Sequence, residues 1–406
     1  MSQKKKLDLV ALASIPLMMT LANSMLIPIL PVIRNELNIT TFQSSMIITV
    51  YSIASILLIP VAGFLSDRYG RKAVMIPCLV VVAAGGLISG LSSWLMKTPY
   101  TVILIGRVVQ GIGASGAFPV VIPTVGDLYR EETEVSKGLG IIETTNTFGK
   151  VVSPVLGSAL GLIAWFVPFL AIPVLSGVSI VLIMLWVKTG KNEKSEKTTI
   201  KDFFKKVKQI FGEKGRWLYA IFFNGFIVMF VLFAYLFYLS TILEDNFHMH
   251  DMKKGLVLAI PLLFLCATSL ITGNLIHADK KLMKWIIFTG FLAATITLPW
   301  VGFLSGLILI ILVLTLSGTG LGATLPCLDA LITEGIVKDD RGTATSFFSG
   351  ARLLGVAVGP PLAALLMNTG SKITFMVLAG SGLAAALAAY LFIKPDNIQN
   401  KQEKTT

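Results

Sequence analysis

The amino-acid sequence predicts an all-α polytopic membrane protein, with twelve transmembrane helices in two pseudo-symmetric six-helix bundles. Hydrophobic residues make up 54% of its 406 residues and charged residues only 14%, with a mean hydropathy of +0.80. Soluble domains, by comparison, carry about 25% charged residues. Long apolar runs recur along the whole chain, and the second half repeats features of the first half at one offset.

Each apolar run is long enough to cross a bilayer, because about 20 residues at the helical rise match the thickness of the hydrocarbon layer. The N-terminal run follows three lysines, as in a signal peptide, but it has no clear small-residue cleavage site and is expected to stay as the first span. The predicted spans are roughly 8–33, 43–66, 73–96, 100–126, 138–162, 165–187, 217–243, 254–277, 284–302, 306–333, 343–367 and 372–393.

Lys and Arg concentrate in alternate loops and tails, which the positive-inside rule assigns to the cytoplasm. We therefore expect both termini to be cytoplasmic. The net charge of +12 then reflects orientation and contact with anionic lipid rather than binding to nucleic acid. Cys78, Cys266 and Cys327 lie in apolar runs without CxxC spacing, which indicates small core side chains rather than disulfides or metal ligands.

The expected domains are an N-terminal six-helix bundle (1–187), a cytoplasmic linker (188–216), a C-terminal six-helix bundle (217–394) and a cytoplasmic tail (395–406). The linker is rich in Lys and has apolar residues at helical spacing, which predicts an amphipathic helix on the cytoplasmic lipid surface. Calmodulin-like binding to a partner protein is the alternative for this segment.

Glycines, prolines and acids of the two halves match at one offset, which favours an internal duplication. The matches are Gly111–Pro119 with Gly318–Pro326, Asp127 with Glu334, and Pro154 with Pro361. Gly111–Gly116 also fits the dinucleotide pattern GxGxxG, but it lies in an apolar span without a preceding strand, so we interpret its small residues as helix-packing positions.

Between the second and third spans stands a charged stretch, Gly-Phe-Leu-Ser-Asp-Arg-Tyr-Gly-Arg-Lys, at residues 63–72. It is predicted to be a very short turn whose charges hold the helix ends at the membrane surface. Gly63 would permit close helix contact and Gly70 an unusual backbone turn. The stretch resembles the loop between helices 2 and 3 of the major facilitator superfamily, whose fold consists of two six-helix halves.

This resemblance implies a latch on the cytoplasmic side. By analogy with the family, Asp67 faces the region of Gly342 at the start of the eleventh span, and Arg71 pairs with Asp127 at the end of the fourth. Such contacts would join the two halves only while the inner side is closed. The predicted latch residues are Gly63, Asp67, Arg68, Gly70, Arg71 and Asp127.

Two further stretches resemble motifs of the drug/proton antiporter branch, with twelve helices, of this superfamily. Arg107–Gly116 is similar to its helix-4 motif, which implies that Arg107 is buried and linked to proton transfer. Residues 149–157 are similar to its antiporter motif, represented here by Gly149, Pro154 and Gly157, although Lys150 departs from the pattern. Helix kinking and packing is the alternative role of this second motif, and both roles can hold.

Ionisable side chains inside the spans are costly and are therefore candidates for function. A carboxyl group with a movable cation as its partner can load and release a proton, because burial raises its pKa and a nearby cation lowers it. The candidates for proton coupling are Glu143, Asp329, Arg107, Lys150 and Arg352. The alternative is a set of static ion pairs that hold spans together.

Aromatic side chains, methionines and a few asparagines could line a greasy central cavity, suited to bulky apolar or cationic compounds. For each of them singly, lipid contact or core packing is the alternative. The residues expected at the cavity are Met19, Asn23, Tyr51, Phe118, Asn146, Asn224, Phe226, Phe230 and Phe348.

The predicted function is proton-coupled export of hydrophobic or cationic small molecules, that is multidrug efflux with antibiotic resistance, by alternating access in a bacterial cell membrane. The first alternative is a dedicated exporter of one metabolite or siderophore on the same fold, and the second is a non-transporting sensor or scaffold. An enzyme is disfavoured, since no nucleophile–base set is evident. We expect a monomer whose partners are the substrate, protons and lipid, without cofactor or metal. The stretch His248–Met252 is interpreted as a solvated loop, with surface metal chelation as the alternative.

Overall fold

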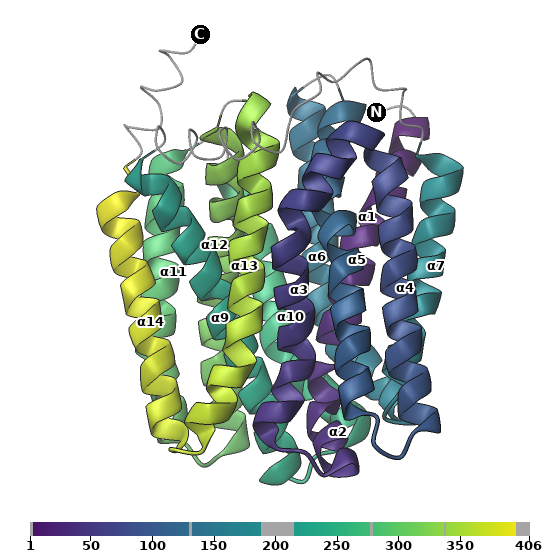
Figure 1. Cartoon of the computed structure of the whole chain (residues 1–406). Coiled ribbons are helices and arrows are strands. Elements are labelled where there is room, and N and C mark those ends of the chain that lie inside the picture. Colours follow the sequence, from purple (N-terminus) through teal and green to yellow (C-terminus); the bar gives the residue numbers. More distant parts are fainter. Residues whose placement is uncertain (1–2, 130–131, 188–214, 277–278, 337, 395–406) are drawn as a thin grey trace. The chain divides into compact units, whose positions relative to one another are not determined.

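The computed structural model describes residues 3–129, 132–187, 215–276, 279–336 and 338–394, and this part of the chain is helical (Figure 1). The first helices are α1 (Gln3–Ser24), η1 (Ile27–Ile29), α2 (Leu30–Leu37), α3 (Thr41–Tyr69), α4 (Arg71–Leu95), α5 (Tyr100–Leu128), α6 (Glu132–Gly161) and α7 (Val167–Trp186). They are followed by α9 (Arg216–Asp245), α10 (Asp251–Leu275), α11 (Lys280–Val301), α12 (Leu307–Glu334), α13 (Lys338–Met367) and α14 (Ser371–Phe392). The linker predicted to be amphipathic lies almost wholly outside the described residues.

All twelve predicted spans correspond to helices, so the fold class is confirmed. Within the described part of the chain, eleven segments are long and apolar enough to cross a membrane by length and composition, counting α1 to α2 as one. The remaining helix is α6, which has a run of polar residues between Glu143 and Lys150 that lowers its hydropathy. A helix with this composition needs protein rather than lipid around its polar face.

The first span, expected as one stretch at roughly 8–33, is divided into three helical pieces. Helix α1 ends at Ser24, the 3-10 turn η1 follows, and α2 continues to Leu37. Pro28 and Pro31 explain the break, because a proline has no backbone N–H to donate to the carbonyl four residues earlier. Pro16 lies inside α1 without ending it.

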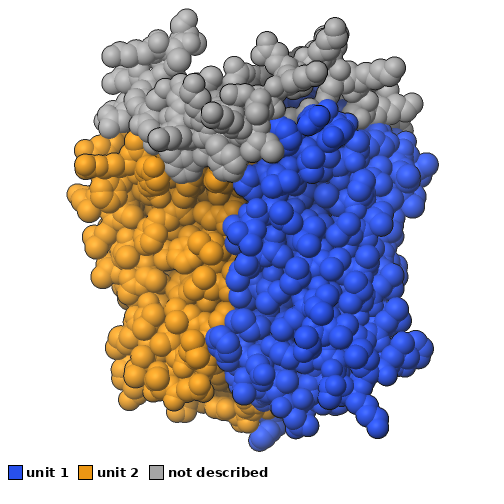
Figure 2. All heavy atoms as spheres, viewed as in Figure 1, with its two compact units in different colours: residues 1–203, 248–256 blue, residues 204–247, 257–406 orange. Residues whose placement is uncertain are grey.

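The chain divides into two compact units (Figure 2), and the contacts described below lie within one unit or the other. Unit 1 comprises residues 1–203 together with 248–256, and unit 2 comprises residues 204–247 together with 257–406. Unit 1 therefore includes the first turn of α10. There, a Cβ added at Gly255 would lie 2.6 Å from both the Pro154 carbonyl oxygen and Ser158 Oγ of α6.

The same helix pairs pack together in the two units. In unit 1, α4 contacts α5 and α7, and α1 contacts α5, α6 and α7. In unit 2, α11 contacts α12 and α14, and α9 contacts α12, α13 and α14. These are corresponding pairs if the first span of unit 1 is matched to the first span of unit 2. The repeated packing supports the internal duplication predicted from the glycine and proline matches.

The matched glycines have the same packing role. A Cβ added at Gly111 of α5 would collide with the backbone oxygen of Tyr51 in α3. At the matching position of α12, a Cβ at Gly318 would lie 3.0 Å from the Pro261 oxygen in α10. In both units the glycine thus lets the fourth span approach the backbone of the second span closely.

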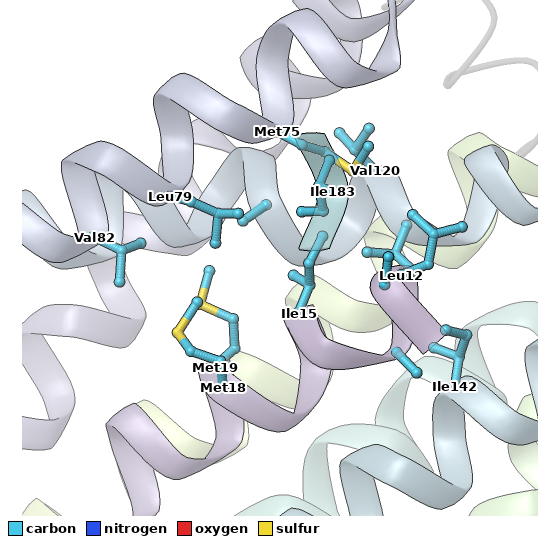
Figure 3. Packing of buried hydrophobic residues seen from close by; sticks show 14 of the residues in the cluster. Leu12, Ile15, Met18, Met19, Met75, Leu79, Val82, Val120, Ile142 and Ile183 are labelled. Carbon is cyan, nitrogen blue, oxygen red and sulfur yellow. The ribbon is translucent and has the colours of Figure 1, made fainter. Parts of the chain in front are cut away.

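The initial spans of the two units are the innermost. Helix α9 is 94% buried over its most apolar window and the α1–α2 segment is 78% buried, against 28% for α7. Leu12, Ile15 and Met18 of α1 accordingly lie at the centre of a core formed with α4, α5, α6 and α7 (Figure 3). The aromatic residues of α9 are mainly core side chains, since only Tyr219 and Phe223 among them are more than one-third exposed.

We predict that Gly290→Val destabilises the protein by about 2 kcal/mol, the usual cost of overpacking a core. A Cβ at Gly290 of α11 would lie 2.5 Å from the Gly320 oxygen and 2.6 Å from Thr324 Cγ2 of α12. Gly380→Val is the matched control, because no described atom lies within 4 Å of a Cβ added at that exposed position of α14. Thermal unfolding of the purified proteins in detergent measures the difference, and equal melting temperatures would contradict it.

Candidate functional site

The charged stretch 63–72 is helical except at one residue. Helix α3 continues to Tyr69, α4 begins at Arg71, and only Gly70 interrupts them, with φ 98°. That value lies in the region where an L-residue is strained, so a glycine is required there. The predicted turn is therefore shorter than expected, because the charges lie within the helix ends.

The predicted ion pair between Arg71 and Asp127 is present, with Arg71 Nε 3.0 Å from Asp127 Oδ2. Arg71 also donates to Ser66 Oγ of α3 at 2.6 Å, and Arg68 lies exposed over the Tyr69 ring. The pair joins the first turn of α4 to the last turn of α5. Asp127 is more than half exposed, so the pair contributes little to stability by itself.

Two other predictions for this stretch concern Gly63 and Asp67. No described atom of unit 1 lies within 4 Å of a Cβ added at Gly63, so the close helix contact of Gly63 stays a prediction. The predicted contact of Asp67 with the region of Gly342 falls outside the described side chains. The latch role of the whole set stays a prediction.

Lys72 has a role that the sequence analysis missed. Its Nζ donates to the carbonyl oxygens of Met184 at 3.0 Å and of Val187 at 2.9 Å. These oxygens lie at the C-terminal end of α7, where carbonyl groups have no partner in the helix and favour a cation. Lys72 thus binds the start of α4 to the end of α7.

Arg107 is completely buried in unit 1, as predicted, and lies in a network of neutral groups. Its Nε donates to the Ile47 oxygen at 2.8 Å, and its Nη2 donates to Asn23 Oδ1 at 2.6 Å. Its Nη1 donates to Gln110 Oε1 and, at 3.4 Å, to the Ala22 oxygen.

The remaining neighbour of this guanidinium is an aromatic ring, since Cζ of Arg107 lies 4.5 Å from the centroid of Tyr51. Every acceptor of Arg107 among the described residues is therefore neutral. Its hydrogen bonds reach α1, α3 and its own helix α5. Gln110 lies within the helix-4 motif Arg107–Gly116. Nothing in the sequence indicated that backbone oxygens of two other helices complete the network.

Glu143 of α6 lies beside Asn146, whose Nδ2 is 3.2 Å from Glu143 Oε2. Asn146 in turn accepts a hydrogen bond of 2.5 Å from Thr20 Oγ1 of α1. Lys150 lies two turns further along α6 and is 6% exposed. The carboxyl group and the ammonium group are therefore on the helix that packs against α1.

In unit 2, Asp329 of α12 and Arg352 of α13 form an ion pair of 3.1 Å between Oδ1 and Nη1. The Asp329 side chain is 28% exposed and that of Arg352 is 12% exposed. The guanidinium of Arg352 lies 5.7 Å from the ring centroid of Phe348, which stacks on Phe222 of α9. The structure thus brings together two of the predicted coupling residues.

The glycines of the second motif pack α6 against the first span. A Cβ added at Gly149 would lie 3.2 Å from Leu17 Cδ1 and from Thr20 Cβ, and one at Gly157 would collide with the backbone of Met25. Pro154 lies within the same helix. These contacts support the packing role of the motif.

The residues predicted for the substrate cavity separate into two groups. In unit 1, Asn23 and Tyr51 contact Arg107, and Tyr51 Oη lies 3.9 Å from Met19 Sδ. Asn146 contacts Glu143 instead. In unit 2, Phe226 stacks on Phe230 at 5.8 Å, and Phe348 packs against Gly225. Seven of the nine are buried and the other two, Phe118 and Phe226, are half-buried. The cavity itself stays a prediction.

One buried polar residue, Lys254 in the first turn of α10, was missed, and Asn224 in unit 2 was expected only as a cavity residue. Asn224 is fully buried, and its Oδ1 has no hydrogen-bond partner among the described residues, whereas its Nδ2 donates to the Ala220 oxygen at 2.8 Å. Lys254 is 2% exposed at the start of α10. A lysine in the first turn of a span is usually interfacial, so its position gave no signal of burial.

A metal site at His248–Met252 has no support in the structure. Among the described residues, no group of three or more His, Cys, Asp and Glu side chains could hold a metal ion.

The comparison with family models assigns this architecture. The model described as "Major Facilitator Superfamily" matches residues 12–351 and 309–406. The chain belongs to the major facilitator superfamily. It is therefore a multi-pass membrane transporter of small molecules and not an enzyme.

Several relatives are known. The chain is 46% identical to the Bacillibactin exporter of Bacillus subtilis (strain 168) over 398 residues, covering 98% of both chains. It is 24% identical to Multidrug resistance protein 2 of the same organism, covering 87% of this chain and 86% of that one. The structure of the human organic anion transporter MFSD10 (TETRAN) shares the fold with a TM-score of 0.76, at 17% identity, covering 96% of this chain and 100% of that chain.

We predict that Arg107→Lys lowers the melting temperature of the purified transporter by several degrees, although the charge is kept. A lysine has one ammonium group and cannot reproduce the planar set of donors that reaches Asn23, Gln110 and two backbone oxygens. Acceptors left buried without a donor cost about 1–3 kcal/mol each. Arg68→Lys, at an exposed position on the same unit, is the control and should melt like the unmodified protein. Identical melting of the two variants would show that the network around Arg107 is not needed for stability.

Proposed function

We propose that this transporter exports bacillibactin or a closely related siderophore from the cell. The observation that carries the proposal is the 46% identity with the Bacillibactin exporter over 98% of both chains. The similarity to Multidrug resistance protein 2 is about half as high and covers less of the chain. Multidrug efflux, the function expected first from the sequence, is therefore the second candidate, and dedicated export is the first.

The charges inside the spans are consistent with a substrate that carries acidic or hydrogen-bond-accepting groups. Within the described spans of unit 1, two buried cations, Arg107 and Lys150, stand against one half-buried carboxyl group, Glu143, and a buried one, Asp8, near the start of α1. Arg107 has only neutral acceptors, so no described carboxylate cancels its charge. A buried cation of this kind disfavours cationic drugs, because like charges repel strongly where water is excluded.

Transport would proceed by alternating access and be driven by protons. Asp329 and Glu143 are the proposed proton carriers. When Asp329 takes up a proton, its carboxyl group loses the charge that attracts Arg352, and the contact between α12 and α13 weakens. Inward proton movement and outward movement of the siderophore would then alternate through the same conformational cycle. The proposed setting is a bacterial cell membrane with both chain termini in the cytoplasm.

The first test is transport in inside-out membrane vesicles that contain the protein. We expect the vesicles to accumulate bacillibactin when their interior is made acidic, and to accumulate ethidium and tetracycline no more than vesicles without the protein. Uptake of the drugs but not of bacillibactin would support multidrug efflux instead. Bacillibactin uptake that persists after a protonophore has collapsed the gradient would refute proton coupling but leave the substrate assignment standing.

The second test identifies the coupling carboxyl group. We expect either Glu143→Gln or Asp329→Asn to reduce the accumulation of bacillibactin driven by the pH gradient at least tenfold. Exchange of bacillibactin across the membrane without a gradient should continue. Asp279→Asn is the matched control, because this exposed carboxyl group caps α11 and an asparagine caps helices equally well. Full gradient-driven accumulation in both variants would exclude these two residues as proton carriers.

A further inference from the structure

One face of α11 combines lysines with aromatic side chains. Lys281, Lys284, Trp285 and Phe288 are spaced three, one and three residues apart, which places them along one face of the helix. Lys281 and Trp285 are exposed, and Lys284 and Phe288 are half-buried. By the distribution of Lys and Arg, the start of α11 lies at the cytoplasmic surface.

The adjacent face of α14 continues this arrangement. Tyr390 closes an aromatic cluster with α11, since its ring centroid lies 6.1 Å from that of Trp285 and 5.6 Å from that of Phe288. Trp285 and Phe288 contact each other edge to face at 5.7 Å. Nζ of Lys284 lies 5.3 Å from the Tyr390 centroid, so the ring holds this ammonium group beside the cluster.

Polarity changes in one direction along these two faces. On α14, the exposed residues Leu383 and Leu387 lead to Tyr390, and the exposed Lys394 follows two residues after the helix ends at Phe392. The order from the membrane interior to the cytoplasm is therefore aliphatic, aromatic and cationic. A phospholipid has the matching order of acyl chain, glycerol interface and phosphate, and aromatic side chains prefer that interface.

We propose that this surface, formed by Lys281, Lys284, Trp285, Phe288, Tyr390 and Lys394, binds an anionic phospholipid of the cytoplasmic leaflet. Charge complementarity selects the ligand, because Lys281 and Lys284 lie in the first turns of α11 and Lys394 follows the end of α14, at the surface where the headgroup would lie. The nearby carboxylate of Asp279 is directed at its own helix, accepting from the backbone N–H groups of Lys281 at 2.9 Å and Leu282 at 3.0 Å. The aromatic cluster and the leucines would hold the glycerol and acyl portions.

The corresponding surface of unit 1 is built differently. Helices α4 and α7 are the counterparts of α11 and α14, but α4 has no aromatic residue between Arg71 and Leu91. Its lysine, Lys72, binds the terminal carbonyl oxygens of α7 instead. The proposed site is thus a property of unit 2 and not a general consequence of the repeated fold.

The same helix pair offers a matched control at its other end. There, Nζ of Lys372 in α14 lies 4.8 Å from the ring centroid of Phe303, just after α11. This lysine–aromatic contact lies at the outer surface and has no cluster of lysines around it in the neighbouring sequence. A general attraction between lysines and anionic lipid would affect both ends, whereas the proposed site requires the inner end alone.

Native mass spectrometry of the full-length protein, titrated in detergent with phosphatidylglycerol or phosphatidylcholine, tests the proposal. We expect the unmodified protein to bind phosphatidylglycerol more tightly than phosphatidylcholine. The double variant Lys281→Gln, Lys284→Gln should weaken phosphatidylglycerol binding at least fivefold and leave phosphatidylcholine binding unchanged. Lys372→Gln should bind both lipids like the unmodified protein.

Tyr390→Leu provides a second variant with unchanged charge, and it should weaken phosphatidylglycerol binding at least twofold. Melting temperatures in phosphatidylcholine report whether each variant is folded, and the comparison uses the variant that melts normally. Equal binding in the variant and the unmodified protein would overturn the proposal, as would an equal loss in Lys372→Gln. Displacement of the bound lipid by millimolar glycerol phosphate would also overturn it, because a soluble anion would then suffice.

Discussion

The guanidinium of Arg107 is the constraint on which unit 1 depends. A cation in the membrane interior is tolerated only if its donors are satisfied by protein groups, since no lipid atom can accept a hydrogen bond there. The acceptors come from α1, α3 and α5, so satisfying the charge also fixes three helices relative to one another. The close approach of α5 to α3 at Gly111 brings the Ile47 carbonyl group of α3 within reach of the side chain.

The two units share their packing but not their charges. The position of α12 that matches Arg107 is Leu314, which is fully buried, so the described helices of unit 2 have no arginine at the matching position. Unit 2 instead has the Asp329–Arg352 ion pair between α12 and α13. Small residues at the helix contacts preserve the repeated architecture, because packing depends on size alone. The chemistry of each unit is therefore free to differ within one fold.

This asymmetry bears on transport. A network of neutral acceptors holds a cation in place, whereas an ion pair between neighbouring helices can be broken by one proton. Unit 1 would then supply a fixed positive charge near the substrate, and unit 2 a contact that responds to the proton gradient. The Glu143–Asn146–Thr20 chain between α6 and α1 adds a second carboxyl group that could respond in the same way. The two units also differ where these helix pairs end. Lys72 of α4 binds a carbonyl oxygen of α7 in unit 1, whereas an aromatic cluster joins α11 to α14 at the matching place in unit 2.

The sequence alone determined the twelve spans, the internal repeat, the superfamily and the Arg71–Asp127 pair. Apolar runs of bilayer length are visible without a structure, and the family motif names both members of that pair. Only the tertiary structure located the partners of Arg107 and Lys72, because most of them are backbone oxygens of distant helices, and every residue has such an oxygen. The break after Ser24 and the single-residue turn at Gly70 were likewise decided in three dimensions. These features depend on backbone geometry and on how closely neighbouring helices approach, which the pattern of residue types does not specify.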